Sequence, residues 1–333
     1  MSYLKYFLTS ALLPILFFFG LGVFLQPLQG DLTRLGNLAE RDFGWNAAQP
    51  VLPLRDNQPA NPGVIVLGDS FSRWNVWQSA SMASGSPAML TFHWDGFDSS
   101  ECLDDWIAAL KETYPSARFL VIEVVEREFL RRFGPAGTRC HGQHQKPVEV
   151  SQGGATQPLR PFFDSTSNLP DTLYAARALY NSFRPFDETT FSTNVFVTPL
   201  NRTNLFSNHR PDLMVYYKDD ELIKKDWKPE DIRKAVTRVK DIQLSAAAHG
   251  LTMITAIVPD KSTTYRKFMR QPQTTPIPDI WKELTKQEVT QVDLREMLDK
   301  AADTVTDLYL PNDTHLGTAG FMLMGEAIAG RIR

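Results

Sequence analysis

The segment ARFLVIEVVERE, residues 117–128, is a near-continuous run of apolar and β-branched residues. A strand with one face in water alternates apolar and polar side chains, whereas this run is typical of a strand buried on both faces of a parallel sheet. Neighbouring parallel strands are joined by long crossovers, which are usually helices. We therefore expect a sheet that is covered by helices on both sides.

The flanking sequence supplies further strands and helices. The other strand candidates are residues 64–68, 88–94, 211–217 and 251–260, with a short stretch around Val292. Helices with one apolar face are expected over residues 99–115, 229–249 and 294–302, and again at the end of the chain. This alternation predicts an α/β domain of three layers, with a mostly parallel sheet between two layers of helices.

Composition narrows the class of protein. The chain has 333 residues, 43% of them hydrophobic, which suffices for a sizeable core. Its formal net charge is −3, so it lacks the broad basic surface that binds nucleic acid. No nucleic-acid partner is expected.

The run YFLTSALLPILFFFGLGVFL, from Tyr6 to Leu25, carries no charged residue. Its length matches the roughly 20 residues that a helix needs to cross a bilayer. A cleaved signal peptide is the alternative, but its apolar core is usually shorter and ends in an Ala-x-Ala-like site, which the following QPLQGDLTRL does not resemble. We predict an uncleaved anchor, with residues 1–28 forming a cytoplasmic stub and one transmembrane helix.

The charges around this run predict its orientation. Lys5 and the terminal amine precede it, which favours a cytoplasmic amino end and a folded domain outside. In a bacterium with two membranes the protein would be a single-pass inner-membrane protein with a periplasmic domain. Disulfides form there, so Cys102 and Cys140, the two cysteines of the chain, could make one bridge.

Domain organisation follows from the breaks in the pattern. Residues 29–62 contain four prolines and are expected to form a connector with one short helix, and residues 63–333 to form the folded domain. Residues 134–211 are rich in Gly, Pro, Ser, Thr and Asn, with one helical pattern over residues 171–183. We interpret 134–211 as an insertion near the mouth of the sheet.

A Gly-Asp-Ser turn follows the first expected strand, with Ser70 as its serine. A serine at the carboxyl end of a buried strand, close to the start of a helix, can expose its hydroxyl to the positive end of the helix dipole. This position suits a nucleophile. A helix N-cap is the alternative, because Ser and Asp are preferred there.

A nucleophilic serine needs a base, and the base usually needs a carboxylate to orient it. Asp313 and His315 lie two residues apart in the turn-rich PNDTHLGTAG, so in an extended backbone they point to the same side. The alternative is that Asp313 or Thr314 caps the last helix and His315 is a surface residue. His141 and His144 lack a third ligand at matching spacing, so no metal site is expected. No cofactor is expected either.

Five segments together carry a resemblance to a known family. They are GDSFS, VIEVVER (residues 121–127), HGLTMITAIVPDKSTTY (249–265), VDLREML (292–298) and DTHLGTAG. Together they resemble the SGNH hydrolase superfamily, and within it the alginate O-acetyltransferase family, membrane-linked or periplasmic enzymes that acetylate exopolysaccharides. The resemblance implies an SGNH-hydrolase-like fold and a Ser70, His315 and Asp313 triad. Two features depart from the alginate enzymes: here the serine precedes the Asp-x-His pair, and Leu316 stands where they tend to have Trp.

The implied reaction is acetyl transfer to a polysaccharide hydroxyl through an acyl-serine, with a membrane-bound O-acyltransferase as the partner that supplies the acetyl group. The expected oxyanion donors are the backbone N–H groups of Ser70 and Gly96. Residues expected to line the substrate site are Trp74, Trp94, Arg127, Lys261 and Tyr265. Each of these roles has a structural alternative. A tryptophan could pack in the core, Arg127 could form an ion pair, and Lys261 could lie in a simple turn before a helix. A carbohydrate esterase and a non-catalytic polysaccharide-binding or scaffold subunit remain the alternative functions.

Overall fold

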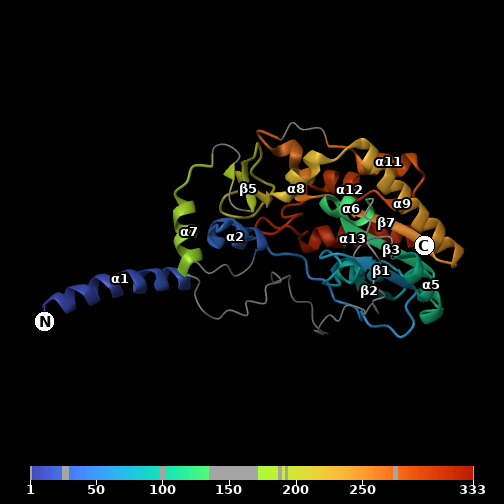
Figure 1. The fold of residues 1–333 in the computed structure, drawn as a ribbon, viewed down its shortest axis with the longest axis horizontal. Coiled ribbons are helices and arrows are strands. Elements are labelled where there is room, and N and C mark those ends of the chain that lie inside the picture. The colour runs from blue at the N-terminus through green and yellow to red at the C-terminus, as the bar shows by residue number, and fades with distance from the viewer. Residues whose placement is uncertain are drawn as a thin grey trace.

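The structure is a computed structural model, shown in Figure 1. It describes residues 2–24, 30–97, 103–134, 172–186, 190–191, 194–272 and 277–332. Cys102 and Cys140 lie outside the described residues, as does much of the expected insertion. The bridge between the two cysteines therefore stays a prediction.

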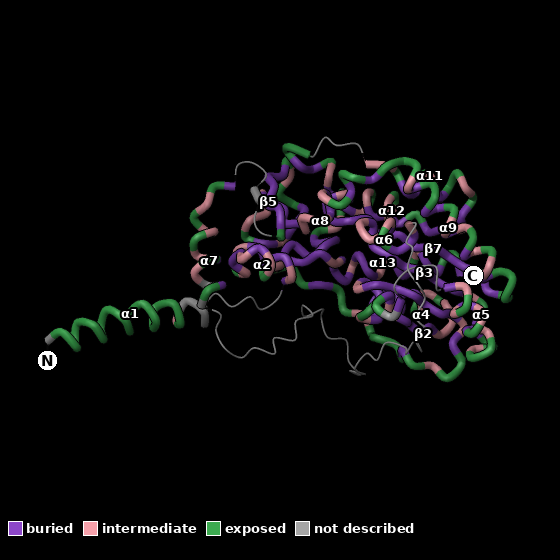
Figure 2. The backbone as a smooth tube through the Cα atoms, in the orientation of Figure 1, coloured by how far each residue is buried: buried purple, intermediate pink, exposed green. Residues whose placement is uncertain are grey.

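The central sheet has five strands in the order β2-β1-β3-β7-β8, and all neighbours are parallel. Its strands are β1 (Val64–Gly68), β2 (Met89–His93), β3 (Phe119–Val125), β7 (Thr252–Val258) and β8 (Gln291–Val292). All but the first residue of β3 are buried, as its continuous apolar run requires (Figure 2). The expected α/β fold with a mostly parallel central sheet is confirmed.

Alternate residues of each strand face opposite layers of helices. Val64 and Val66 pack in one apolar cluster with α4 (Val76–Ala83), α12 (Leu294–Ala301) and α13 (Thr318–Ile332). Ile65 and Leu67 pack in a second cluster on the other face. The helices of this second face are α5 (Leu103–Thr113), α6 (Phe129–Phe133), α9 (Pro229–Ala248) and α11 (Ile280–Lys286). The core therefore has two halves with the sheet between them.

A second, smaller sheet is antiparallel and consists of β4 (Thr190–Phe191), β5 (Val195–Pro199) and β6 (Leu213–Tyr217). The expectation that residues 211–217 resume the main sheet is therefore wrong. A short apolar run predicts a strand but says nothing about its partner, and here the partner is β5. Leu32, Leu38 and Phe43, from the expected connector, complete the core of this sheet.

In the amino-terminal part, the described residues form the helices α1 (Ser2–Phe24), α2 (Asp31–Gly36) and α3 (Glu40–Phe43). Within α1, residues Tyr3–Gly20 are long and apolar enough to span a membrane, and Tyr3 to Phe19 are exposed (Figures 1 and 2). The helix expected within the insertion is α7 (Thr172–Ser182). The remaining short helices are η1 (Trp94–Gly96), η3 (Glu126–Glu128), α8 (Asp219–Leu222), η4 (Ile223–Asp226), α10 (Lys261–Tyr265) and η5 (Arg266–Phe268).

Candidate active site

The Gly-Asp-Ser turn begins where β1 ends, at the carboxyl edge of the sheet. Asp69 holds it: Oδ1 accepts the Phe71 N–H at 2.9 Å, and Oδ2 accepts the Val125 N–H at 2.7 Å from the end of β3. A glycine is required at position 68 because Ser72 lies so close to its backbone that an added Cβ would be 2.1 Å from Ser72 Oγ. These contacts fix the backbone on both sides of the serine.

Ser70, His315 and Asp313 form one continuous chain of hydrogen bonds. Ser70 Oγ lies 2.8 Å from His315 Nε2, and His315 Nδ1 lies 2.6 Å from Asp313 Oδ1. The same Oδ1 accepts the His315 backbone N–H at 2.9 Å. A carboxylate only accepts, so Nδ1 carries the hydrogen and Nε2 is left to accept the Ser70 proton. This is the arrangement that makes a serine hydroxyl nucleophilic.

The electrostatics of the pair favour its charged form. Burial alone would lower the pKa of His315, but the charge of Asp313 and its hydrogen bond outweigh burial and raise it. Burial would raise the pKa of Asp313, but His315 outweighs this effect and lowers it. The site therefore stabilises an imidazolium beside a carboxylate, as a proton-accepting base requires.

A second carboxylate, Asp31 of α2, contacts this loop and was not expected from the sequence. Its Oδ1 accepts the Thr314 N–H at 2.9 Å, and its Oδ2 accepts the Thr314 hydroxyl at 2.7 Å. Burial, together with the charge of Asp313, raises the pKa of Asp31 to about 6. Local sequence shows only an acidic residue at the start of a short helix, because the contact joins residues 283 positions apart.

The carboxylates of Asp31 and Asp313 and the imidazole of His315 offer three ligand atoms within 4.8 Å of one another. However, His315 Nδ1 and Asp313 Oδ1 are 2.6 Å apart. Two ligands bound tetrahedrally to one zinc at about 2.0 Å would be roughly 3.3 Å apart. The spacing fits a direct hydrogen bond better than shared ligation of zinc.

Two residues expected at the substrate site instead support residues 309–315, the candidate catalytic loop that carries Asp313 and His315. Lys261 is buried, and its Nζ donates to the carbonyl oxygens of Leu310 at 2.7 Å, Pro311 at 3.0 Å and Asp313 at 3.2 Å. Tyr265 is also buried, and its hydroxyl accepts the backbone N–H of Tyr309 at 3.3 Å. The expectation of direct substrate contact is corrected for both, because neither side chain is accessible.

The two tryptophans differ. Trp94 has no exposed surface, and its Nε1–H donates to the Glu123 carbonyl at 2.8 Å, so it is a core residue rather than a substrate contact. Trp74 is half-buried, with the Arg73 guanidinium 5.6 Å from its ring centroid, and retains surface for a ligand. Gly96 ends η1 directly after β2, the strand beside β1, and its role as an oxyanion donor stays a prediction.

Arg127 takes part in a nearly buried ionic cluster at the carboxyl ends of β3 and β7. Its Nη1 donates to Asp260 at 2.6 Å and Asp220 at 3.1 Å, and 12% of its side chain is exposed. Lys224 pairs with Asp260 at 2.9 Å and Glu126 at 3.1 Å. Two carboxylates already hold the Arg127 guanidinium, so its geometry agrees with a structural ion pair rather than with a substrate contact.

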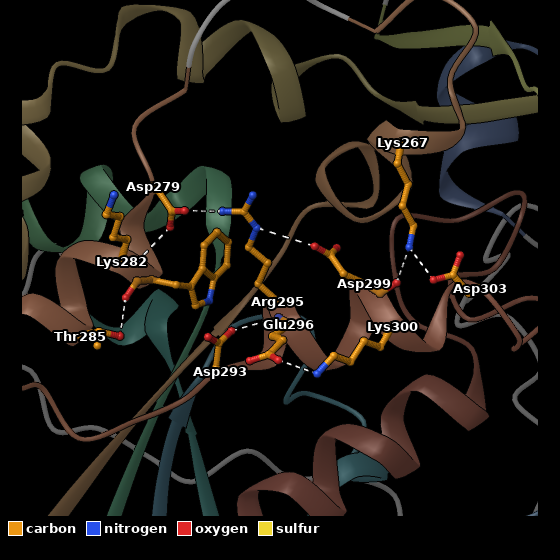
Figure 3. A pocket seen from close by; sticks show the side chains of 11 residues that line it. Lys267, Asp279, Lys282, Thr285, Asp293, Arg295, Glu296, Asp299, Lys300 and Asp303 are labelled. Atoms are coloured by element: carbon orange, nitrogen blue, oxygen red, sulfur yellow. Dashed lines mark hydrogen bonds and ion pairs between the residues drawn. The ribbon is translucent and has the colours of Figure 1, made fainter.

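A pocket of about 420 Å³, lined mostly by charged residues, lies between α11, α12 and η5 (Figure 3). Arg295 covers the ring of Trp281 at 5.3 Å and pairs with Asp279 at 2.9 Å, while Lys267 pairs with Asp303 at 2.7 Å. The described residues that line this pocket include none of the Ser70, His315 and Asp313 group. It is therefore a different place from the candidate active site.

Comparison with protein families identifies a match over the carboxyl-terminal part of the chain. Residues 215–333 match the family described as SGNH hydrolase-like domain, acetyltransferase AlgX. The match includes Lys261, Asp313 and His315, whereas Ser70 precedes it. A search of curated proteins finds no match to the chain. The resemblance to the SGNH-like alginate acetyltransferases is thereby confirmed over residues 215–333, which are similar to the SGNH hydrolase-like domain of acetyltransferase AlgX.

Proposed function

We propose that this protein is an O-acetyltransferase that acetylates hydroxyl groups of an exopolysaccharide through an acyl-serine. The observation that carries the proposal is the hydrogen-bonded chain from Ser70 through His315 to Asp313. The family match supports the acetyl-transfer chemistry over the segment that contains the base and its carboxylate.

The reaction has two halves. His315 Nε2 takes the Ser70 proton as Oγ attacks the acetyl carbonyl, and the imidazolium then gives that proton to the departing group of the donor. In the second half His315 deprotonates the sugar hydroxyl, which attacks the acetyl-serine and restores the Ser70 hydroxyl. Asp313 orients the ring and stabilises the imidazolium. The N–H groups of Ser70 and Gly96 are the proposed oxyanion donors, each worth about 3 kcal/mol of barrier.

The proposed location is the inner membrane, with α1 spanning it, the amino end in the cytoplasm and the catalytic domain in the periplasm. The exposed apolar side chains of α1 support the span, since such a surface is stable in lipid. The proposed acetyl source is a membrane-bound O-acyltransferase, because acetyl-CoA is on the cytoplasmic side. The acceptor is a polysaccharide, to which the exposed part of Trp74 could offer an aromatic face.

The test uses the purified full chain, an activated acetyl ester, and an oligosaccharide acceptor. We expect mass spectrometry to find an acetyl adduct on the peptide that contains Ser70, and to find acetylated sugar. Both should be lost in Ser70→Ala, while Ser245→Ala on α9 should behave as the parent. Hydrolysis of the ester without sugar acetylation would identify an esterase instead. Sugar acetylation that survives in Ser70→Ala would support a non-catalytic role for this site.

A further inference from the structure

Residues 30–32, which come after α1 in the chain, contact the catalytic loop. Besides the Asp31 contacts with Thr314, the Leu32 N–H donates to the Asn312 carbonyl at 3.0 Å. An added Cβ on Gly30 would lie 2.0 Å from that carbonyl oxygen, so the two backbones are as close as a glycine allows. The amino-terminal segment that we expected to be a connector therefore packs directly against the loop that carries His315.

We propose that Asp31 is a positioning residue of the catalytic site, holding the turn Asp313-Thr314-His315 where the imidazole reaches Ser70. This inference rests on the proposed function. Each oxygen of the Asp31 carboxylate accepts one of the two donors of Thr314, which lies between the two functional residues. The Asp31 backbone N–H in turn faces Asp313 Oδ2 at 3.4 Å. Asp31 thus acts on the turn through both its side chain and its backbone.

The position of Asp31 also gives it an electrostatic effect. Its charge raises the pKa of His315, in the same direction as the larger effect of Asp313. Among the described residues, the other charged groups around the turn are Lys261, under its carbonyls, Glu40 of α3, which accepts from Asn312, and Arg127, whose charge lowers the pKa of His315. Removing the Asp31 charge leaves these groups in place and lowers the pKa of His315. That change marks a positioning carboxylate and is not expected from simple loosening of the fold.

Asp31→Asn in the full chain is the first test, because the amide keeps the size of the side chain but loses the charge and one acceptor. We expect kcat for the activated acetyl ester to fall about 10- to 100-fold, as for a small misplacement of a catalytic group, with KM changed far less. The acidic limb of the pH–rate profile should move to lower pH. Asp42→Asn, on α3 of the same segment, is the matched control and should change neither quantity.

Thr314 provides a second test from the other side of the contact. Thr314→Val removes the hydroxyl donor while keeping the shape, and it should lower kcat, whereas Thr314→Ser should restore most of it. Because both side chains act through one contact, Thr314→Val should cost much less in the Asp31→Asn background than in the parent.

The inference is overturned if Asp31→Asn keeps the parent kcat, or if its acidic limb does not move. It is also overturned if the Asp31 and Thr314 effects on kcat simply multiply. Ser70→Ala, assayed in parallel, separates this failure from failure of the proposed function. A fully active Ser70→Ala would remove the acyl-serine mechanism itself, whereas an inactive Ser70→Ala beside a normal Asp31→Asn would remove only the role of Asp31.

Discussion

Lys261 has three N–H donors when protonated, and the catalytic loop turns three carbonyl oxygens toward it. The side chain is buried, and burial lowers its pKa to about 7. A lysine after a strand is equally compatible with substrate binding, so the sequence could not distinguish a ligand from a support. The distinction depends on where the loop of residues 310–313 lies.

Lys261→Met should therefore destabilise the fold and disable the site together. Leaving three buried carbonyls without their donor is expected to cost at least about 2 kcal/mol of unfolding free energy. Urea unfolding of the parent and the variant measures this difference. Lys225→Met, which changes an exposed lysine of η4, is the control and should alter the midpoint little.

The role of Asp313 predicts how the reaction rate depends on pH. The rate requires neutral His315, whose pKa Asp313 raises above its ordinary value, so kcat/KM should fall as pH drops through that raised pKa. Asp313→Asn should move this acidic limb to lower pH and reduce kcat by roughly 10³- to 10⁴-fold, the effect of losing ring orientation. A pH–rate profile of the acetyl-ester reaction checks both. An Asp313→Asn enzyme with an unshifted limb would contradict the role given to this carboxylate.

At the scale of elements, the turn after β1 is closely packed. Ser72 and Glu123 fill the room beside Gly68, and Ser72 Oγ donates to Glu123 Oε2 at 2.6 Å. Burial and the nearby Asp69 carboxylate raise the pKa of Glu123 well above its ordinary value. Glu123 of β3 thus supports the turn that presents Ser70, since its Oε2 also accepts the Asp69 N–H at 3.0 Å.

Gly68→Ala should disturb that turn, because its Cβ would lie 2.1 Å from Ser72 Oγ and 2.8 Å from Glu123 Oε2. Overpacking of this kind costs about 1–3 kcal/mol, and the displaced serine should lose most of its activity. Gly330→Ala in α13 is the control, since nothing lies within 4 Å of its added Cβ and alanine favours a helix by up to about 1 kcal/mol. Thermal unfolding and the acetyl-ester assay of both variants compare the two positions.

At the scale of the whole molecule, α1 is the basis for predicting on which side of the membrane the folded domain lies. A reporter enzyme that needs disulfides to be active, fused after Arg333, should be active in cells because the folded domain is expected outside the cytoplasm. The same reporter fused to the amino end should be inactive. Activity at the amino end with none at the carboxyl end would reverse the proposed orientation.

The sequence by itself predicted the central parallel sheet, most of its helices and the candidate nucleophile, base and carboxylate. Periodicity and turn residues are local signals, and Gly-Asp-Ser and Asp-x-His each lie within a few residues. It failed for β6, whose partner is β5, and for Trp94, whose apolar ring fits a core as well as a ligand site. A short run of residues determines neither which strand will pair with it nor how far its side chains will be exposed.

Only the tertiary structure decided how the site is supported. Asp31, Lys261 and Glu123 are separated from the groups they hold by about 50 to 280 positions in the chain. No local pattern marks a hydrogen bond over such a separation, because it depends on how strands and loops meet at the carboxyl edge of the sheet. Residue types and short motifs were thus enough to select Ser70 and His315 as candidates, whereas the contact between their loop and the segment after α1 required the positions of these residues in space.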